Sequence, residues 1–313
     1  MSSNLQFPLS GHWTISKPIQ YVEEGTTNAT YGVTPTASPA FQLAGAVQDI
    51  SDTHSRETFM KRVVGLRTRY KELLLKDRYT FELKFAPFNS TLIKYGTENA
   101  VGTGTIAASL SFARVQKLNN AGTLSDSFTF YKGCRCTSMD INVSGTGIVE
   151  CTSSWVARQK TVPVFTANGG LTTPVWKEFA DLTATPWTHV DGGAAPLTID
   201  GVTYPVTQFH INWNNNLSID DLCGSQLIDN NEQANKDVTG DFTVIVGKNL
   251  LLETKMDTFP LPADTASYVL KTATSTISMT GLSLTQSADA QRAEDNTSWR
   301  IPYTFTAATA SVS

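Results

Sequence analysis

The sequence predicts a mainly β protein, a sandwich or barrel with one short helix and long hairpins. The 313-residue chain contains 43 threonines, and β-branched residues suit the pleated surface of a strand. Several segments alternate apolar and polar residues with a period of two, as half-buried strands do. Glycine, proline and Asp-Gly turn signals separate these segments, which is typical of hairpins.

Composition excludes several classes of function. The chain is 40% hydrophobic and 17% charged, with a net charge of -4, so it can bury a core but is poorly suited to gripping DNA by neutralising phosphates. No apolar run reaches the roughly 18 residues of a membrane span, and no secretory signal is visible at the start. The small share of charged residues indicates that part of the surface meets other protein.

Residues 1–55 are polar with many turn signals, and we expect an N-terminal arm of extended chain and loops. The first clear period-two strand runs from Tyr79 to Phe85 and ends at Pro87. Ser90 is a candidate N-cap for a short helix that Gly96 ends.

Residues 138–157 predict a hairpin with one apolar and one polar face. Met139, Ile141 and Val143 alternate with polar residues, a Gly-Thr-Gly turn follows at 145–147, and the return segment keeps the same alternation.

A second strand pair is predicted at 206–214 and 237–246. An Asp-Gly turn at Asp200 and Gly201 predicts a small hairpin just before it, inside a loop and hairpin insertion at 160–204. We expect a β domain over 56–258, which further strands within 259–313 complete.

Motifs for catalysis are absent from the sequence, so we expect no enzyme activity, no cofactor and no metal site. The four histidines His12, His54, His189 and His210 are scattered, and none belongs to an H-E-x-x-H arrangement. His210 lies on the polar face of a strand, and we interpret it as a plain surface histidine.

Charge is unevenly distributed along the chain. Residues 56–84 hold nine basic against four acidic side chains, whereas residues 220–257 hold eight acidic against three basic ones. One interpretation is two solvated surfaces. The other is a pair of complementary patches that dock one subunit on the next, with these proposed contact residues: Arg67, Arg69, Lys71, Asp220 and Asp221.

Several segments together resemble the major tail tube proteins of long-tailed bacterial and archaeal viruses. YTFELKFAPFNSTLIKYG resembles their strand and short helix, and MDINVSGTGIVECTSSWVA their first long hairpin. HVDGGAAPLTIDGVTYPVTQFHINWNNNL resembles the hairpin that leads into the second long hairpin, whose strands FHINWNNNLSIDDL and KDVTGDFTVIVGKN resemble two later strands of the family. The resemblance covers roughly residues 79–258, and the motifs are structural.

The resemblance implies a β-sandwich or small barrel, a fold shared with the type VI secretion tube. It also implies a virion protein assembled in the host cytoplasm into stacked, six-fold rings that form a hollow tail tube. The implied partners are further copies of the chain, tape measure and terminator proteins of the tail, and double-stranded DNA in transit. No membrane partner is implied.

The two hairpins would then line the channel with their polar faces. These faces lack lysine and arginine, so they would repel phosphates and let DNA slide. An alternative is that they are the wet faces of an ordinary sandwich. The proposed channel-facing residues are Asp140, Asn142, Glu150, Thr152, Gln208, His210, Asn212, Thr239, Asp241 and Thr243.

A different class of function also fits the composition, a carbohydrate-binding β-sandwich adhesin of a virion or cell surface. Trp176, Trp187 and Trp299 lie in loop-like contexts, where aromatic rings could stack on sugars.

Overall fold

The computed structural model confirms a mainly β fold. It describes residues 15–25, 31–61, 71–97, 109–120, 122–220, 230–233, 236–245, 265–286, 291–292 and 299–313. Every strand pair in this part of the chain is antiparallel except for two isolated bridges. The strands are β1 (Gln20–Gly25), β2 (Gln42–Leu43), β3 (Ala46–Lys61), β4 (Lys71–Ala86), β5 (Ser109–Asn120), β6 (Thr123–Ser144), β7 (Glu150–Ala157), β8 (Gln159–Lys160), β9 (Leu197–Ile199), β10 (Val202–Tyr204), β11 (Val206–Asn214), β12 (Leu217–Asp220), β13 (Asn230–Gln233), β14 (Asp237–Ile245), β15 (Thr265–Lys271), β16 (Ser275–Gln286), β17 (Gln291–Arg292) and β18 (Trp299–Val312).

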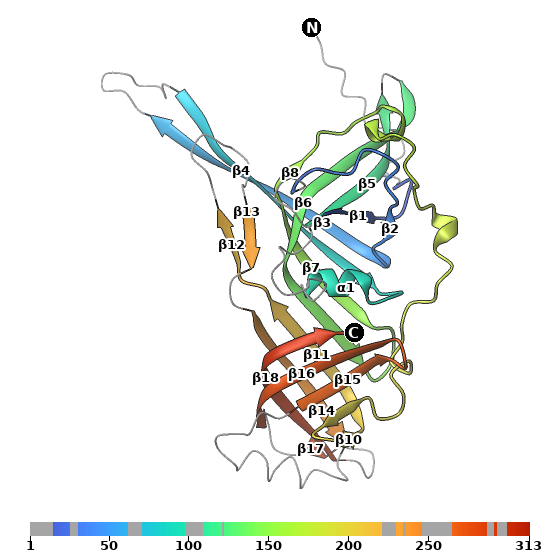
Figure 1. Ribbon diagram of the computed structural model, residues 1–313, viewed down its shortest axis with the longest axis vertical. Helices are drawn as coiled ribbons and strands as arrows, with labels where there is room; N and C mark the ends of the chain where they lie inside the picture. Colours follow the sequence, from blue (N-terminus) through green and yellow to red (C-terminus); the bar gives the residue numbers. More distant parts are fainter. Residues whose placement is uncertain are drawn as a thin grey trace.

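Strand β6 joins the two halves of the molecule. Its first part pairs with β5, which continues to β1 and β2. Its last part pairs with β7 on one side and β11 on the other. From β11 the sheet continues through β14, β18, β16, β15, β9 and β10. Figure 1 shows β6 running from the upper half, with β5 and β1, into the lower half, with β11, β14 and β18.

The main core lies on one side of this long sheet. Phe209 on β11 stacks on Tyr268 of β15 with ring centroids 3.8 Å apart, although three strands, β16, β18 and β14, separate β11 from β15 in the sheet order. The sheet therefore curls over its own apolar side chains, and Ile211 and Trp213 are fully buried there. The polar side chains of β11 point to the opposite side of the sheet, away from this core.

A smaller core lies between β1, β5 and the first part of β6. It is formed by Val22, Phe41, Val115 and other buried residues. Trp176 lies parallel to Phe41 with the ring centroids 4.3 Å apart, so the segment that follows β8 closes this core.

Strands β3 and β4 form a long hairpin whose far ends project from the body of the molecule (Figure 1). Only residues 79–85 of β4 also pair with β7. Near this base, Asp52 on β3 accepts a hydrogen bond from Tyr131 at 3.0 Å and is paired with Lys160 and Arg114. Despite partial burial, these partners hold the pKa of Asp52 below its usual range.

The short helix α1 (Thr91–Gly96) forms where the sequence predicts it. Ser90 occupies the N-cap position but makes no side-chain cap; the Thr91 N–H donates instead to Asn89 Oδ1 at 2.9 Å. The expected hairpin at 197–204 is also present, with Asp200 and Gly201 both in the left-handed region that an Asp-Gly type I′ turn requires.

The N-terminal segment differs from the expected arm. Residues 1–55 contain β1, β2 and most of β3. In β1 the adjacent residues Tyr21 and Val22 are both buried, because the strand is covered on both faces. Such a strand has no period-two pattern to recognise.

Asn215, directly after β11, ties the helix to the sheet. Its fully buried side chain donates to the Gly96 carbonyl at 2.8 Å and to the Cys136 carbonyl at 2.9 Å. This fixes the end of β11 and so the position of its polar face.

We expect Asn215→Ala to lower the free energy of unfolding by about 2–3 kcal/mol, because two buried carbonyl groups lose their donor. Chemical denaturation measures this. Asn212→Ala on the outer face of β11 is the control, with an expected change below about 0.5 kcal/mol. Equal losses for both variants would contradict the bridging role of Asn215.

Candidate functional site: a polar sheet face

The ten predicted channel-facing residues share one face of four neighbouring strands. The strands lie in the order β7, β6, β11, β14. His210 is opposite Asn142 on β6 and Asp241 on β14. Residues directly opposite each other in an antiparallel pair point to the same side, so these residues lie together on one polar face.

The other members of the set follow from the same register. Asn212 is opposite Asp140 and Thr239, and Gln208 is opposite Thr243. On the far side of β6, Thr152 is opposite Asp140 and Glu150 is opposite Asn142. All ten are exposed or half-buried, which leaves a continuous polar surface over the main core.

This polar face extends beyond the four predicted strands. Strand β4 pairs with the outer edge of β7, and β18 pairs with the outer edge of β14. Lys84 on β4 forms an ion pair with Glu150 at 3.3 Å, and Thr304 on β18 lies opposite Asp241. The sequence missed this extension because strand order depends on contacts distant in the chain.

His210 is held between two carboxylates from neighbouring strands. Its Nε2 lies 2.5 Å from Asp140 Oδ2 on β6, and its Nδ1 lies 2.8 Å from Asp241 Oδ1 on β14. The hydrogen bond to Asp140, supported by that to Asp241, outweighs partial burial and raises the pKa of His210 from 6.5 to about 9.

The interpretation of His210 as a plain surface histidine is therefore wrong. About a third of its side chain is exposed, but both ring nitrogens are engaged. Sequence reasoning missed this because Asp140, His210 and Asp241 are far apart in the chain. Only the order of the strands in the sheet brings them together. Their shared polar face was the available signal.

Gly240 supports the same strands from the apolar side. A Cβ atom at this position would lie 2.3 Å from the His210 carbonyl oxygen and 2.5 Å from the Phe305 ring. The absent side chain lets Phe305 pack directly against the β11–β14 pair beneath His210 and Asp241.

Most of the predicted subunit-contact residues lie outside the described residues. This applies to Arg67, Arg69 and Asp221. Lys71 and Asp220 lie at the start of β4 and the end of β12, and only their backbone is described. The complementary-patch interpretation stays a prediction.

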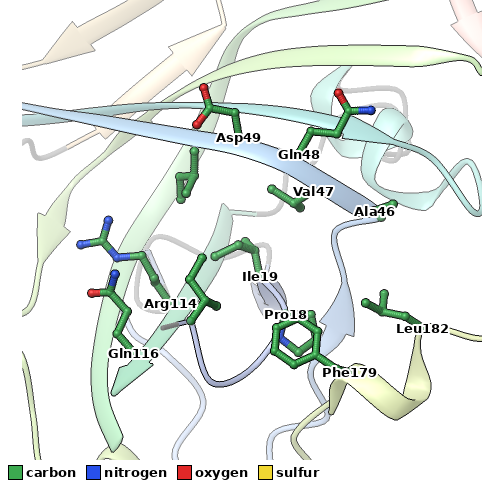
Figure 2. A pocket seen from close by; sticks show the side chains of 13 residues that line it. Pro18, Ile19, Ala46, Val47, Gln48, Asp49, Arg114, Gln116, Phe179 and Leu182 are labelled. Carbon is green, nitrogen blue, oxygen red and sulfur yellow. The ribbon is translucent and has the colours of Figure 1, made fainter. Parts of the chain in front are cut away.

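A hollow of about 450 Å³ lies beside β3, lined by apolar side chains on one side and by Asp49, Arg114 and Gln116 on another (Figure 2). Figure 2 shows Pro18, Ile19, Val47 and Phe179 around it, from the segment before β1, from β3, and from the 3-10 turn Phe179–Asp181. About half of Phe179 is exposed. Among the described strands β3 pairs only with β4, so the hollow adjoins an unpaired sheet edge.

The tryptophans proposed for sugar stacking are partly explained by packing. Trp187 is buried in the main core, and Trp176 packs on the smaller core. The side chain of Trp299 lies outside the described residues. Trp187 therefore offers no open ring face for a sugar, and Trp176 has one ring face stacked on Phe41.

The polar face and its two hairpins agree with a comparison to protein families. The family model for the phage tail tube protein matches residues 16–307. The chain belongs to this family. No curated protein matches the chain.

The tail tube family is structural, so the protein is a virion component that assembles with other tail proteins. Within the described residues, no group of three or more histidine, cysteine or acidic side chains is arranged to hold a metal ion. None of the helices described there is long and apolar enough to cross a membrane.

We expect Gly240→Ala to destabilise this tail tube protein by about 3 kcal/mol or more, because the new methyl group clashes with backbone as well as with an aromatic ring. Thermal unfolding measures the change. Ser283→Ala on the exposed face of β16 is the control, with little expected effect. A Gly240→Ala protein as stable as the parent would show that β11, β14 and β18 are not packed this closely.

Proposed function

We propose that this tail tube protein forms six-fold rings that stack into a hollow tube, with the polar face of β7, β6, β11 and β14 lining the channel that conducts DNA. The observation that supports this most is the unbroken polar surface across these neighbouring strands. The main apolar core lies directly behind this polar surface, so the packed core supports the hydrated channel wall.

The chemistry of the face suits a conduit. Seven of the ten residues are uncharged or histidine, and Asp140, Glu150 and Asp241 are acidic. Lys84, the nearby cation on β4, is paired with Glu150. A phosphate passing along these four strands meets hydroxyl groups, amides and carboxylates. Among the described residues of the flanking strands, the exposed Arg300 lies at the start of β18, opposite Ile245 at the end of β14.

The strand count sets the size of the channel. If each of six copies contributes between four strands and the six strands from β4 to β18, a spacing of about 4.8 Å gives a backbone diameter of about 37 to 55 Å before strand tilt. Strand tilt widens the channel further.

Neighbouring copies cannot join by pairing β7 with β14, because β4 and β18 already occupy those edges. The contact we propose is the edge of β3 that pairs with no other described strand, together with the hollow beside it, occupied by a second copy of this chain. An exposed apolar side chain such as Phe179, next to a strand edge that pairs with no other described strand, favours a protein partner.

At the ends of the tube we propose contacts with the tape measure and terminator proteins of the tail. Assembly takes place in the host cytoplasm before the virion is complete. These partners follow from the role of a tube that must have a defined length and a closed end during assembly.

We expect the purified protein to form rings or tubes with six-fold symmetry under the electron microscope.

Phe179→Asp should prevent assembly and leave the subunit folded, because it places a charge in the hollow while altering a side chain that is already half exposed. Val162→Asp is the matched control, since Val162 is exposed and lies outside the hollow. A protein that stays monomeric at high concentration would contradict the proposed function, and normal tubes from Phe179→Asp would contradict the proposed contact.

Adding cations to the polar face should slow DNA passage without affecting assembly. We expect Asn142, Asn212 and Thr239 changed together to lysine to delay DNA release from assembled particles, most strongly at low salt, because phosphates bind the new ammonium groups. A single Thr123→Lys change at the exposed β5–β6 hairpin end is the control. Unchanged release from the triple variant would show that this face is not the channel wall.

A further inference from the structure

The two contacts of His210 determine its protonation state on geometric grounds. A neutral imidazole carries one N–H, and an ionised carboxylate only accepts hydrogen bonds. Both ring nitrogens of His210 lie within 2.8 Å of carboxylate oxygens, one from Asp140 and one from Asp241. With Asp140 and Asp241 both ionised, both contacts are hydrogen bonds at once only if the ring is an imidazolium with two N–H donors.

We propose that His210 is a built-in cation of the polar face, which joins β6, β11 and β14 and reduces the charge presented by Asp140 and Asp241 from two negative charges to one. The structural part of this proposal concerns the folded subunit alone. Its consequence for DNA rests on the proposed function.

The groups around His210 leave these two carboxylates as its principal electrostatic partners. On its own strand, Gln208 donates to Asp241 Oδ2 at 3.4 Å. Asn142, Thr239 and Thr304 on β6, β14 and β18 are uncharged. Next along the face come Glu150 on β7 and Lys84 on β4, which pair with each other, and the opposite face of the sheet presents buried Phe209, Ile211 and Phe242.

A positively charged His210 is compatible with a channel wall along which DNA passes. The imidazolium has two N–H groups, and each is directed to a carboxylate of the same subunit, so neither is free for a DNA phosphate. Without the cation, two carboxylates on either side of β11 would repel each other and strain the pairing of the three strands. A lysine or arginine would satisfy the charge but would leave donors that can bind phosphate.

The pH dependence has a definite sign. The pKa of His210 in the folded chain, about 9, is above its ordinary value of 6.5. The stabilisation is therefore present in full below about pH 6.5 and is lost as the pH rises through about 9. A histidine with an ordinary pKa would instead lose its charge, and this stabilisation, near neutral pH.

The direct test is a pH titration of the full chain labelled with ¹⁵N histidine, followed by NMR in solution or, for assembled tubes, in the solid state. His210→Asn assigns the signal, and His189→Asn is the matched control for removal of another histidine. We expect both ring nitrogens of His210 to be protonated at pH 7.5, with a midpoint near 9. A neutral ring at pH 7.5, with a midpoint near 6.5, would overturn the proposal.

Two isosteric variants identify the source of the effect. Asp140→Asn and Asp241→Asn each remove one charge while keeping the side-chain shape, and each should lower the titration midpoint of His210, Asp140→Asn by more. A midpoint unchanged by both variants would show that these carboxylates do not hold the proton.

Stability gives an independent readout. Between pH 6 and pH 9.5 we expect the folding equilibrium constant of the parent to fall about 10- to 100-fold more than that of His210→Asn. Equal losses in the two proteins would contradict the cross-strand role. Because these measurements report on His210 itself, a correct titration in a protein that forms no tubes would refute the proposed function and leave this inference standing.

Discussion

The antiparallel register of β6, β11 and β14 is the constraint on which the rest of the structure depends. It places Ile141, Ile211 and Phe242 on the buried side and every alternate residue on the outer side. A slip of one residue in any of these strands would exchange the two faces. Three contacts fix this register. Asn215 holds the end of β11, and Gly240 lets Phe305 pack against the buried side of β11 and β14. On the polar side, His210 lies between its two carboxylates.

Much of this could be predicted from the sequence wherever a strand is buried on one face only. The alternation in 139–143 and 206–214 gives both the strands and their polar residues, and an Asp-Gly pair gives the hairpin at Asp200. The short helix was predictable from its position between Pro87 and Gly96. These are local signals, and each depends on residues close together in the chain.

Other features depend on contacts between distant segments, which a single sequence does not encode locally. Strand β1 shows no alternation because Tyr21 and Val22 are both covered. The flanking of the four-strand face by β4 and β18 follows from strand order, as does the meeting of Asp140, His210 and Asp241. The hollow at Phe179 forms because the segment after β8 returns to β3, which no pattern in that segment indicates.

Membership of the tail tube family and the polar face together support a subunit whose wet outer surface becomes an inner wall on assembly. A cryo-electron microscopy map of the assembled protein tests this most directly, through the radial position of each strand. We expect β6, β11 and β14 to lie closest to the tube axis, with the side chains of residues 142 and 210 pointing into the bore. A map that places these strands on the outer wall, or with their polar face against a neighbouring subunit, would contradict it.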